Sequence, residues 1–361
     1  MYAYVGSFNY VGSEGIHLCE YDEGDGRLRY VRTMYPHINA GSLCIYRNLL
    51  LATDEASSGH VYCFEVNPQT GELTERSCTE TLGINPSYIT IDSKEQYVIV
   101  THFAVGEPVK LTERSGHGYV SRLRGNDSPT CLYRLDREKG LGELLDVGMH
   151  VPEHGFMTMF HKAYESPDHT FFAENDLGDN QVYFFRIENE KLRCISRAAV
   201  GQGEEGPRHG AFHPRLPYLY LNYEHKSKVS RLDISDLNHV TIAEELELFE
   251  PGEVLAPEDN QSEIMFSPDG KLLYNFMRAK GIAYVIEVDE VTGGMKLKQK
   301  FHLPGNDPRG ARYSPDERFI LIEGHNSGMV YTLDLREDGT LCYQGKACAM
   351  AHPACIAFYQ N

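Results

Sequence analysis

Side chains that could do chemistry recur in this chain at two fixed distances from a turn sequence. The turn sequence is Ser-Pro-Asp or a close variant, found at Pro167, Pro214, Pro268 and Pro315, with a degenerate copy at Ser93. Six residues before these positions stand Ser87, His161, Arg208, Ser262 and Arg309. Ten residues after them stand Phe103, Leu177, Glu224, Arg278 and His325. The arginines, histidines and glutamate in these sets could together bind a small anion and supply a general acid or base.

The turn sequence is flanked by short runs rich in Val, Ile, Tyr and Phe, which are typical of β-strands. Such runs occupy residues 97–100, 182–185, 218–221, 284–286 and 319–322. Helical periodicity is scarce, and many runs are separated by a polar stretch, a Gly, and a Leu two residues later, which is a hairpin pattern. The sequence therefore predicts an all-β protein.

The spacing of the turn sequence indicates a repeat. From Pro167 to Pro315 successive copies are 47, 54 and 47 residues apart, which is typical of the four-stranded blade of a β-propeller. Five marked repeats, one near residues 41–83, and a blade shared by the N-terminus and residues 353–358 make seven. We therefore predict one seven-bladed propeller domain over residues 1–361, with antiparallel blades. An insertion at about 104–130 lies in the third blade.

Blade geometry explains why the two sets of residues belong together. In each blade the innermost strand should lead into the turn sequence and the second strand should lead away from it. The start of the first strand and the end of the second then lie on the same face of the disc. Because equivalent positions in successive blades surround one axis, we expect both sets to meet at the mouth of a central channel.

The charge of the chain narrows the choice of ligand. With 52 acidic and 34 basic residues the formal net charge is −18, which argues against a nucleic-acid surface. A cationic site in so acidic a protein favours a small anionic ligand. The N-terminal residues lack a signal-peptide pattern and no apolar run is long enough to span a bilayer, so we expect no membrane partner.

The remaining motifs predict neither a metal nor a cofactor. The nine cysteines include no C-x-x-C pair, so we interpret them as buried thiols of a reducing cytoplasm. His150, His154, His161 and His169 have no standard metal-ligand spacing. Residues 201–206 match G-x-G-x-x-G, but two glutamates would repel a pyrophosphate and Pro207 leads into a strand. We expect a blade-connecting loop there.

Gly206-Pro-Arg-His209, together with Asp176-Leu-Gly178, Asn85-Pro-Ser87 and Pro353-Ala-Cys355, resembles the seven-bladed propeller lactonase family. That family includes cycloisomerase-type 6-phosphogluconolactonases and fungal carboxy-cis,cis-muconate lactonizing enzymes. The resemblance runs from Tyr4 to Phe358 and implies that the site residues are His161, Arg208, Glu224 and Arg278. The chain departs from the family pattern at Asn222-Tyr-Glu-His225 and at Met277-Arg-Ala279.

The leading hypothesis is hydrolysis of a sugar δ-lactone, foremost 6-phosphoglucono-1,5-lactone of the pentose phosphate pathway, by a cytoplasmic enzyme. His161 or Glu224 would act as general base and then as acid. Arg208 and Arg278 would stabilise the oxyanion, a role typically worth ~3 to 4 kcal/mol per donor.

The phosphate of such a substrate needs a separate binding group. We expect Arg309 to hold it, with Lys280 or His325, because a guanidinium meets phosphate oxygens in pairs. Ser87 and Ser262 complete the predicted substrate-binding residues. Two alternatives stay open: a lactonizing cyclase that acts on a dicarboxylate muconate, and a non-catalytic propeller that binds an anionic metabolite or a protein partner.

Overall fold

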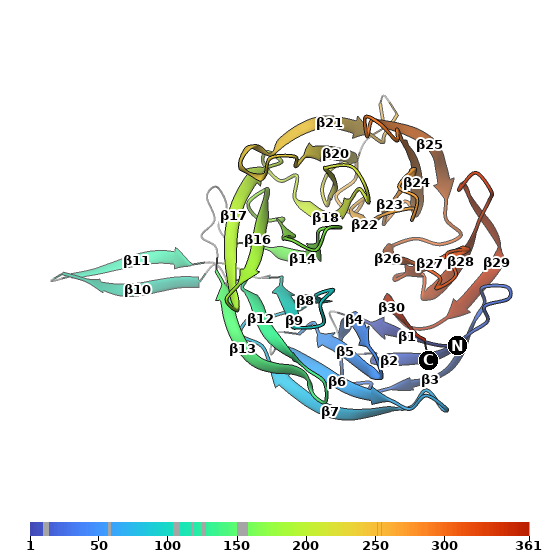
Figure 1. Cartoon of the computed structure of the whole chain (residues 1–361), viewed down its shortest axis with the longest axis horizontal. Coiled ribbons are helices and arrows are strands. Elements are labelled where there is room, and N and C mark those ends of the chain that lie inside the picture. Colours follow the sequence, from blue (N-terminus) through green and yellow to red (C-terminus); the bar gives the residue numbers. More distant parts are fainter. Residues whose placement is uncertain are drawn as a thin grey trace.

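The computed structural model shows seven β-sheets arranged radially around a central axis (Figure 1). The structure describes residues 1–9, 14–56, 59–103, 109–116, 118–124, 128–149, 158–250, 252–253 and 255–360. Each of the seven sheets has four antiparallel strands, and a further sheet is a two-stranded hairpin. The predicted fold class, a seven-bladed β-propeller, is confirmed.

We number the blades along the chain and give the strands of each from the axis outward. Blade 1 contains β30 (Pro353–Tyr359), β1 (Tyr2–Ser7), β2 (Ile16–Tyr21) and β3 (Leu28–Met34). Blade 2 contains β4 (Ala40–Tyr46), β5 (Leu49–Asp54), β6 (His60–Val66) and β7 (Leu73–Glu80). Blade 3 contains β8 (Pro86–Ile91), β9 (Tyr97–His102), β12 (Thr130–Asp136) and β13 (Gly140–Gly148).

The other four blades follow in order without interruption. Blade 4 contains β14 (Phe160–Glu165), β15 (Phe172–Asp176), β16 (Gln181–Glu188) and β17 (Lys191–Ala199). Blade 5 contains β18 (Pro207–Phe212), β19 (Tyr218–Tyr223), β20 (Lys228–Asp233) and β21 (Thr241–Glu247), with the 3-10 helix η1 (Leu237–His239) before β21. Blade 6 contains β22 (Gln261–Phe266), β23 (Leu272–Met277), β24 (Ile282–Val288) and β25 (Met295–His302). Blade 7 contains β26 (Pro308–Tyr313), β27 (Phe319–Gly324), β28 (Met329–Leu335) and β29 (Leu341–Ala349).

Blade 1 closes the ring by joining the two ends of the chain. Strand β30 pairs antiparallel with β1, so that Tyr359 lies opposite Tyr2 and Ile356 lies opposite Val5. Figure 1 shows the two termini side by side. The pairing satisfies the backbone groups of β1 that would otherwise form an exposed sheet edge. The prediction that strands from both ends share a blade is confirmed.

The insertion of blade 3 contains a hairpin of its own. Strands β10 (Val109–Ser115) and β11 (Gly118–Arg124) pair with each other, and both lie in sequence between β9 and β12. The hairpin falls within the predicted insertion at 104–130, of which residues 104–108, 117 and 125–127 lie outside the described residues. In Figure 1 the hairpin projects beyond the rim of the disc.

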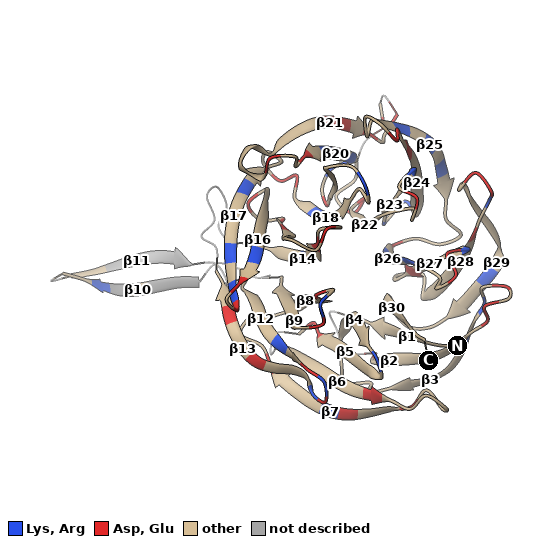
Figure 2. Cartoon of the chain, viewed as in Figure 1, with Lys and Arg blue, Asp and Glu red and all other residues tan. Residues whose placement is uncertain are grey.

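The core consists of apolar layers between neighbouring blades. Each of the seven clusters of buried side chains combines residues from two adjacent blades, as Tyr4 and Leu18 of blade 1 pack with Leu50 and Phe64 of blade 2. All six residues of β5 are therefore buried, because both faces of an inner strand are covered. Outermost strands such as β7 are mainly exposed, and charges of both signs are spread around the rim (Figure 2).

The turn sequence has a physical explanation in the structure. In blade 6 the hydroxyl of Ser267 donates to Asp269 at 2.6 Å and accepts the backbone N–H of Leu272 at 2.9 Å. The same two bonds form around Ser166 and Ser314, so the serine ties the turn to the start of the second strand. In blade 5, Nδ1 of His213 takes the place of the serine and accepts from Arg215 and Leu216. This substitution explains the variant His-Pro-Arg.

The prediction that the cysteines are buried is wrong for five of the nine. Cys78 and Cys194 are exposed, and Cys44, Cys342 and Cys355 are partly exposed. The exposed pair lies on β7 and β17, outermost strands whose side chains are mostly exposed or partly exposed. All nine are free thiols. Within the described residues no helix is long and apolar enough to cross a membrane.

Candidate active site

One hydrogen bond, repeated in every blade, positions the predicted site. The first residue after the second strand donates its backbone N–H to the carbonyl of the residue that precedes the innermost strand of the same blade. The seven donor and acceptor pairs are Phe8 and His352, Glu55 and Asn39, Phe103 and Asn85, Leu177 and Met159, Glu224 and Gly206, Arg278 and Asn260, and His325 and Asp307. The start of the first strand and the end of the second therefore meet on one face in all seven blades.

An irregularity in strand pairing brings a second set of side chains from the innermost strands to the channel. In all seven blades the pairing between the first two strands shifts register at the start of the innermost strand, as between Pro207 and Gly210. A bulge of this kind interrupts the strict alternation of side chains. Four of the residues that follow the predicted ones in sequence therefore also line the channel, namely Tyr88, His209, Glu263 and Gly310, together with Ser42 of blade 2.

Glu224 is held between two arginines at this end of the channel. Its Oε2 lies 3.2 Å from Nε of Arg208, and its Oε1 lies 3.9 Å from Nη1 of Arg278. Arg208 is almost fully buried, and its Nη1 donates to the carbonyl of Ser262 at 2.7 Å. Arg278 also lies 4.0 Å from the carboxylate of Asp307. Three of the four residues that the resemblance indicated thus form one cluster.

His161 adjoins this cluster through a second histidine. Its Nδ1 lies 3.0 Å from Nε2 of His209, and Nδ1 of His209 lies 2.9 Å from Oε1 of Glu263. The carboxylate of Glu263 also pairs with Lys162 at 3.4 Å. Strands β14, β18 and β22 contribute these residues, so the chain of contacts crosses from blade 4 to blade 6.

Arg309 lies on the other side of the channel, against blades 1 and 2. Its Nη2 is 3.4 Å from Oε1 of Glu55, and its guanidinium carbon is 4.3 Å from the centre of the Phe8 ring. Both side chains of the ion pair are mostly buried. Phe8 and Glu55 occupy the same position in blades 1 and 2 as Glu224 does in blade 5. Sequence reasoning missed them because those two blades lack the turn sequence.

The other predicted binding residues have partners within the protein. The hydroxyl of Ser87 donates to main-chain carbonyls, among them that of His161 at 3.0 Å. The hydroxyl of Ser262 donates to the carbonyl of Pro308. Nζ of Lys280 lies 3.2 Å from the carboxylate of Asp259 and above the Phe249 ring. The imidazole of His325 is buried and its Nδ1 lies 3.3 Å from the carbonyl of Pro353.

Electrostatics keep the cluster ionised and its histidines neutral. Burial acts to raise the pKa of Glu224, but Arg278 and Arg208 outweigh it, so this pKa lies below the ordinary value. Burial, then Arg208, holds the pKa of His161 well below its ordinary value. Burial and Arg278 lower the pKa of Arg208 to about 9, which leaves the guanidinium charged at neutral pH.

Residues mainly from the innermost strands enclose a cavity of about 60 Å³. Its lining includes His161, Arg208, Arg309 and a further acid, Glu323 of β27. Glu323 is almost fully buried, and neither of its carboxyl oxygens makes a hydrogen bond with the described residues. Burial raises the pKa of Glu323 to about 8, so the group is a neutral acid at neutral pH. The sequence offers no signal for it, because it lies within an apolar strand.

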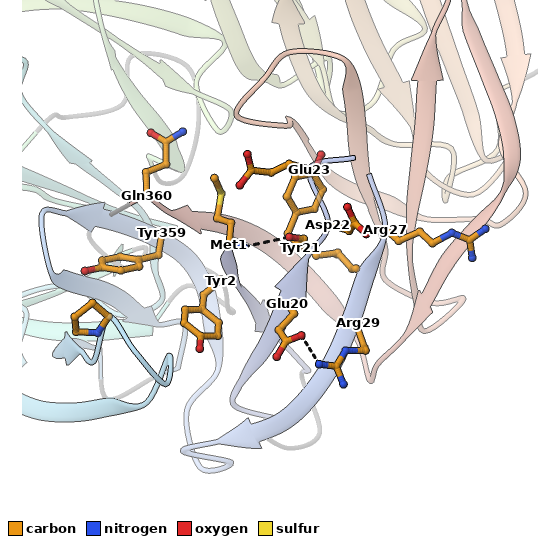
Figure 3. A pocket seen from close by; sticks show the side chains of 12 residues that line it. Met1, Tyr2, Glu20, Tyr21, Asp22, Glu23, Arg27, Arg29, Tyr359 and Gln360 are labelled. Carbon is orange, nitrogen blue, oxygen red and sulfur yellow. Dashed lines mark hydrogen bonds and ion pairs between the residues drawn. The ribbon is translucent and has the colours of Figure 1, made fainter. Parts of the chain in front are cut away.

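A larger hollow, of about 1280 Å³, lies at one end of the four strands of blade 1 (Figure 3). It is lined by residues from both ends of the chain and contains none of the predicted site residues. Of its charged side chains, Arg29 pairs with Glu20, and Arg27 pairs with Asp25 outside the hollow. We therefore place the candidate site at the central channel. Within the described residues no group of three or more His, Cys, Asp or Glu side chains is arranged to hold a metal ion.

Comparison with known proteins identifies the family of the chain. The family model described as "Lactonase, 7-bladed beta-propeller" matches residues 2–358. The chain belongs to this lactonase family. Family membership confirms the resemblance stated above and, at the level of the family, the prediction of a lactonase-type ester hydrolase.

Relatives and solved structures carry consistent names. The chain is 23% identical to the 6-phosphogluconolactonase of Bacillus subtilis, over 98% of this chain and 97% of that protein. It superposes on a putative 6-phosphogluconolactonase of Bacteroides fragilis with a TM-score of 0.81 and 20% identity, over 99% and 98% of the chains. It superposes on a periplasmic gluconolactonase of Pseudomonas aeruginosa with a TM-score of 0.83 and 19% identity, over 99% of both chains. At these identities the structural matches establish the fold.

Proposed function

We propose that this protein hydrolyses a sugar δ-lactone, foremost 6-phosphoglucono-1,5-lactone, to the open-chain acid. The observation that carries the proposal is the cluster of His161, Arg208, Glu224 and Arg278 at the mouth of the channel in a member of the lactonase family. Hydrolysis of a lactone needs a base that activates water and a cation that stabilises the oxyanion. The cluster can supply both from side chains alone.

His161 is the better candidate for the base. Both oxygens of Glu224 face guanidinium groups, whereas Nε2 of His161 has no hydrogen-bond partner among the described residues. In this mechanism Nε2 takes a proton from water as the water oxygen attacks the carbonyl carbon. The imidazolium then returns that proton to the ring oxygen as the carbon–oxygen bond of the lactone breaks.

Arg208 and Arg278 would stabilise the charge that forms on the carbonyl oxygen between these steps. Their positions are fixed by Glu224, which contacts both guanidinium groups. The positive groups also lower the pKa of His161. An anionic substrate that neutralises part of this charge would make His161 a stronger base, so binding and activation of the base are coupled.

Arg309 is the best candidate for the phosphate of the substrate. Nδ1 of His325 must donate to the carbonyl of Pro353, and burial lowers the pKa of this imidazole to about 3. A neutral ring then presents only a lone pair at Nε2, which does not suit a phosphate. Lys280 is held by Asp259. Arg309 instead borders the cavity itself.

The test of the reaction is hydrolysis of freshly generated 6-phosphogluconolactone, coupled to a dehydrogenase and compared with the spontaneous rate. We expect turnover by the wild type and a fall of about 100-fold or more for His161→Ala, Arg208→Ala and Arg278→Ala, with folding confirmed by circular dichroism. His239→Ala, on the exposed helix η1, is the control and should retain the wild-type rate. A wild-type rate equal to the spontaneous rate would exclude this substrate.

The test of phosphate binding compares this substrate with unphosphorylated glucono-δ-lactone. We expect Arg309→Gln to lower kcat/KM for the phosphorylated lactone by about 10-fold or more. The same substitution should change kcat/KM for glucono-δ-lactone much less. An equal loss for both lactones would assign Arg309 to the reaction centre or to structure.

A muconate-type substrate is the second candidate. A stretch of 125 residues is 28% identical to muconate cycloisomerase 1 of Cutaneotrichosporon cutaneum, although it covers only 33% of this chain. The arginines would then bind carboxylates in place of a phosphate and an oxyanion. Incubation with carboxymuconates, followed by ultraviolet absorbance, distinguishes this reaction from lactone hydrolysis.

The cytoplasmic location of the protein stays a prediction.

A further inference from the structure

Three side chains from neighbouring blades form a continuous chain of hydrogen bonds that ends at the channel. Glu263 of β22 contacts His209 of β18, with 2.9 Å between Oε1 and Nδ1. His209 contacts His161 of β14, with 3.0 Å between Nε2 and Nδ1. His209 is buried, and Glu263 exposes only 12% of its side chain. Water therefore competes little for these contacts.

The partners of His209 determine where its proton lies. The carboxylate of Glu263 only accepts hydrogen bonds, so Nδ1 of His209 must carry a hydrogen. Nη1 of Arg208 lies 3.3 Å from Nε2 of His209, and a guanidinium only donates. Two independent neighbours thus require the neutral form of His209 with its hydrogen on Nδ1 and a lone pair on Nε2.

The position of the hydrogen on His161 follows from that on His209. Since Nε2 of His209 is an acceptor, Nδ1 of His161 must donate to it. A neutral His161 with its hydrogen on Nδ1 has a lone pair on Nε2. That atom has no hydrogen-bond partner among the described residues, and the side chain of His161 lines the cavity.

We propose that His209 and Glu263 are positioning residues that hold the proton of His161 on Nδ1, so that Nε2 faces the channel as a proton acceptor. The role of this tautomer in catalysis rests on the proposed lactonase function, whereas the assignment of the tautomer does not. The carboxylate of Glu263 also provides a negative charge at the far end of the chain when His161 becomes cationic. The arrangement resembles in logic the acid that orients the histidine of a serine hydrolase, with a second imidazole between them.

The ionisation of Glu263 agrees with this arrangement. Burial acts to raise the pKa of Glu263, but Lys162 and His209 outweigh it and hold the pKa below its ordinary value. Burial is also the main cause that lowers the pKa of His209 to about 3, against the opposing effect of Glu263. At neutral pH the pair is therefore a carboxylate and a neutral imidazole.

The direct test is nitrogen NMR of the full-length protein labelled with ¹⁵N in histidine only. Long-range proton–nitrogen spectra distinguish a protonated from an unprotonated ring nitrogen, and His161→Gln assigns the resonances of His161. In the wild type at neutral pH we expect Nδ1 of His161 protonated and Nε2 unprotonated. The opposite tautomer in the wild type would overturn the proposal.

Two substitutions at residue 209 make a matched pair. His209→Phe keeps a ring but removes both nitrogens, and we expect the second tautomer of His161 to appear. His209→Gln keeps an acceptor toward His161 and a donor toward Glu263, so the wild-type tautomer should persist. An unchanged tautomer in His209→Phe would overturn the proposal. His209→Leu, which also removes both ring nitrogens, is the second variant should His209→Phe fail to fold, and it should also give a mixture of tautomers.

Kinetics with the phosphorylated lactone add an independent readout. We expect His209→Phe to lower kcat by about 10-fold or more with little change in KM, and His209→Gln to restore most of the loss. Equal losses in both variants would contradict a positioning role. Should the wild type hydrolyse no lactone, the spectra still decide the tautomer, so failure of the proposed function is seen separately.

Discussion

At the scale of single residues, Glu224 holds two guanidinium groups in place. Its carboxylate contacts Arg208 at 3.2 Å and Arg278 at 3.9 Å in a mostly buried position. Loss of its charge removes the carboxylate that Arg208 and Arg278 share, and among the described residues only Asp307, 4.0 Å from Arg278, remains as an ion-pair partner there. Glu224→Gln should therefore lower kcat/KM for the lactone by about 100-fold, because a misplaced oxyanion donor costs that much. The measurement is the initial rate of the coupled assay.

A control for Glu224→Gln is Glu205→Gln, in the loop between β17 and β18, where Glu205 pairs with Lys228. This variant should keep the wild-type rate. A wild-type rate in Glu224→Gln, with unchanged folding, would exclude Glu224 from the reaction.

Glu323 makes stability depend on pH. Its pKa is raised from 4.5 to about 8 by burial, so between these values the folded state binds one proton more than the unfolded state. Stability from this group is present at low pH and is lost as pH rises through that window. Glu323→Gln has no such proton to lose, so it does not share this loss. The Tm of the variant relative to that of the wild type should therefore rise by several degrees from about pH 5 to about pH 8. Thermal unfolding at both pH values measures it.

The exposed Glu337 provides the comparison for this experiment. Glu337→Gln should change Tm equally at both pH values. A constant difference for Glu323→Gln would show that this carboxyl is ionised in the folded protein.

At the scale of elements, the backbone is unusual just before the innermost strand in blades 1, 3 and 7. Asn85, Asp307 and His352 adopt φ values of 48°, 55° and 41°, and a proline follows each. Asparagine and aspartate tolerate this left-handed region, whereas a β-branched residue does not. The carbonyl of Asn85 also accepts the N–H of Phe103 at 2.9 Å. In these blades the local conformation therefore helps to position the site residues.

Asn85→Val should destabilise the protein by ~1 to 3 kcal/mol, because a valine at positive φ is strained. Asn85→Gly should cost much less, since glycine adopts this conformation freely. The check is the free energy of unfolding from a urea titration monitored by circular dichroism. Equal losses for the two variants would mean that the side-chain amide, and not the backbone conformation, matters.

The elements also explain how much of the site was predictable. Fixed distances from the turn sequence predicted the positions of His161, Arg208, Glu224 and Arg278, because each blade repeats the same bonds. Glu55 was missed because blade 2 has no turn sequence. His209 and Glu263 were missed because a bulge brings consecutive residues to the channel, contrary to strand alternation. Reading the residue five positions before each marked turn would have found them.

The sequence also does not distinguish ligand-binding serines from structural ones, for a second physical reason. A serine at the right position can bind either a ligand or a carbonyl of the protein. Ser87 and Ser262 donate to carbonyls of the neighbouring blade, a choice that depends on how blades pack and not on local sequence. The seven-bladed fold itself was fully predictable, because the period and the shared terminal blade are both properties of the sequence.

At the scale of the whole molecule, closure of blade 1 joins the chain ends. Because Tyr2 lies opposite Tyr359, a short linker can connect the termini without strain. A circular permutant opened between Gly203 and Glu204, in an exposed loop, should keep the fold and a Tm within several degrees of the wild type. A chain that ends at His352 lacks β30 and should show no cooperative unfolding. Circular dichroism with heating measures both, and a cooperative transition of the shortened chain near the wild-type Tm would contradict this view.

The position of β30 has a consequence for synthesis on the ribosome. The strand that completes the ring is translated last, and it supplies Ala354 and Cys355 to the wall of the cavity. Blades 2 to 7 can form as they emerge, but the channel has no complete wall until β30 has left the exit tunnel. A nascent chain that lacks β30 therefore carries almost every site residue and yet no enclosed site, so the activity proposed here arises only after β30 has joined the ring.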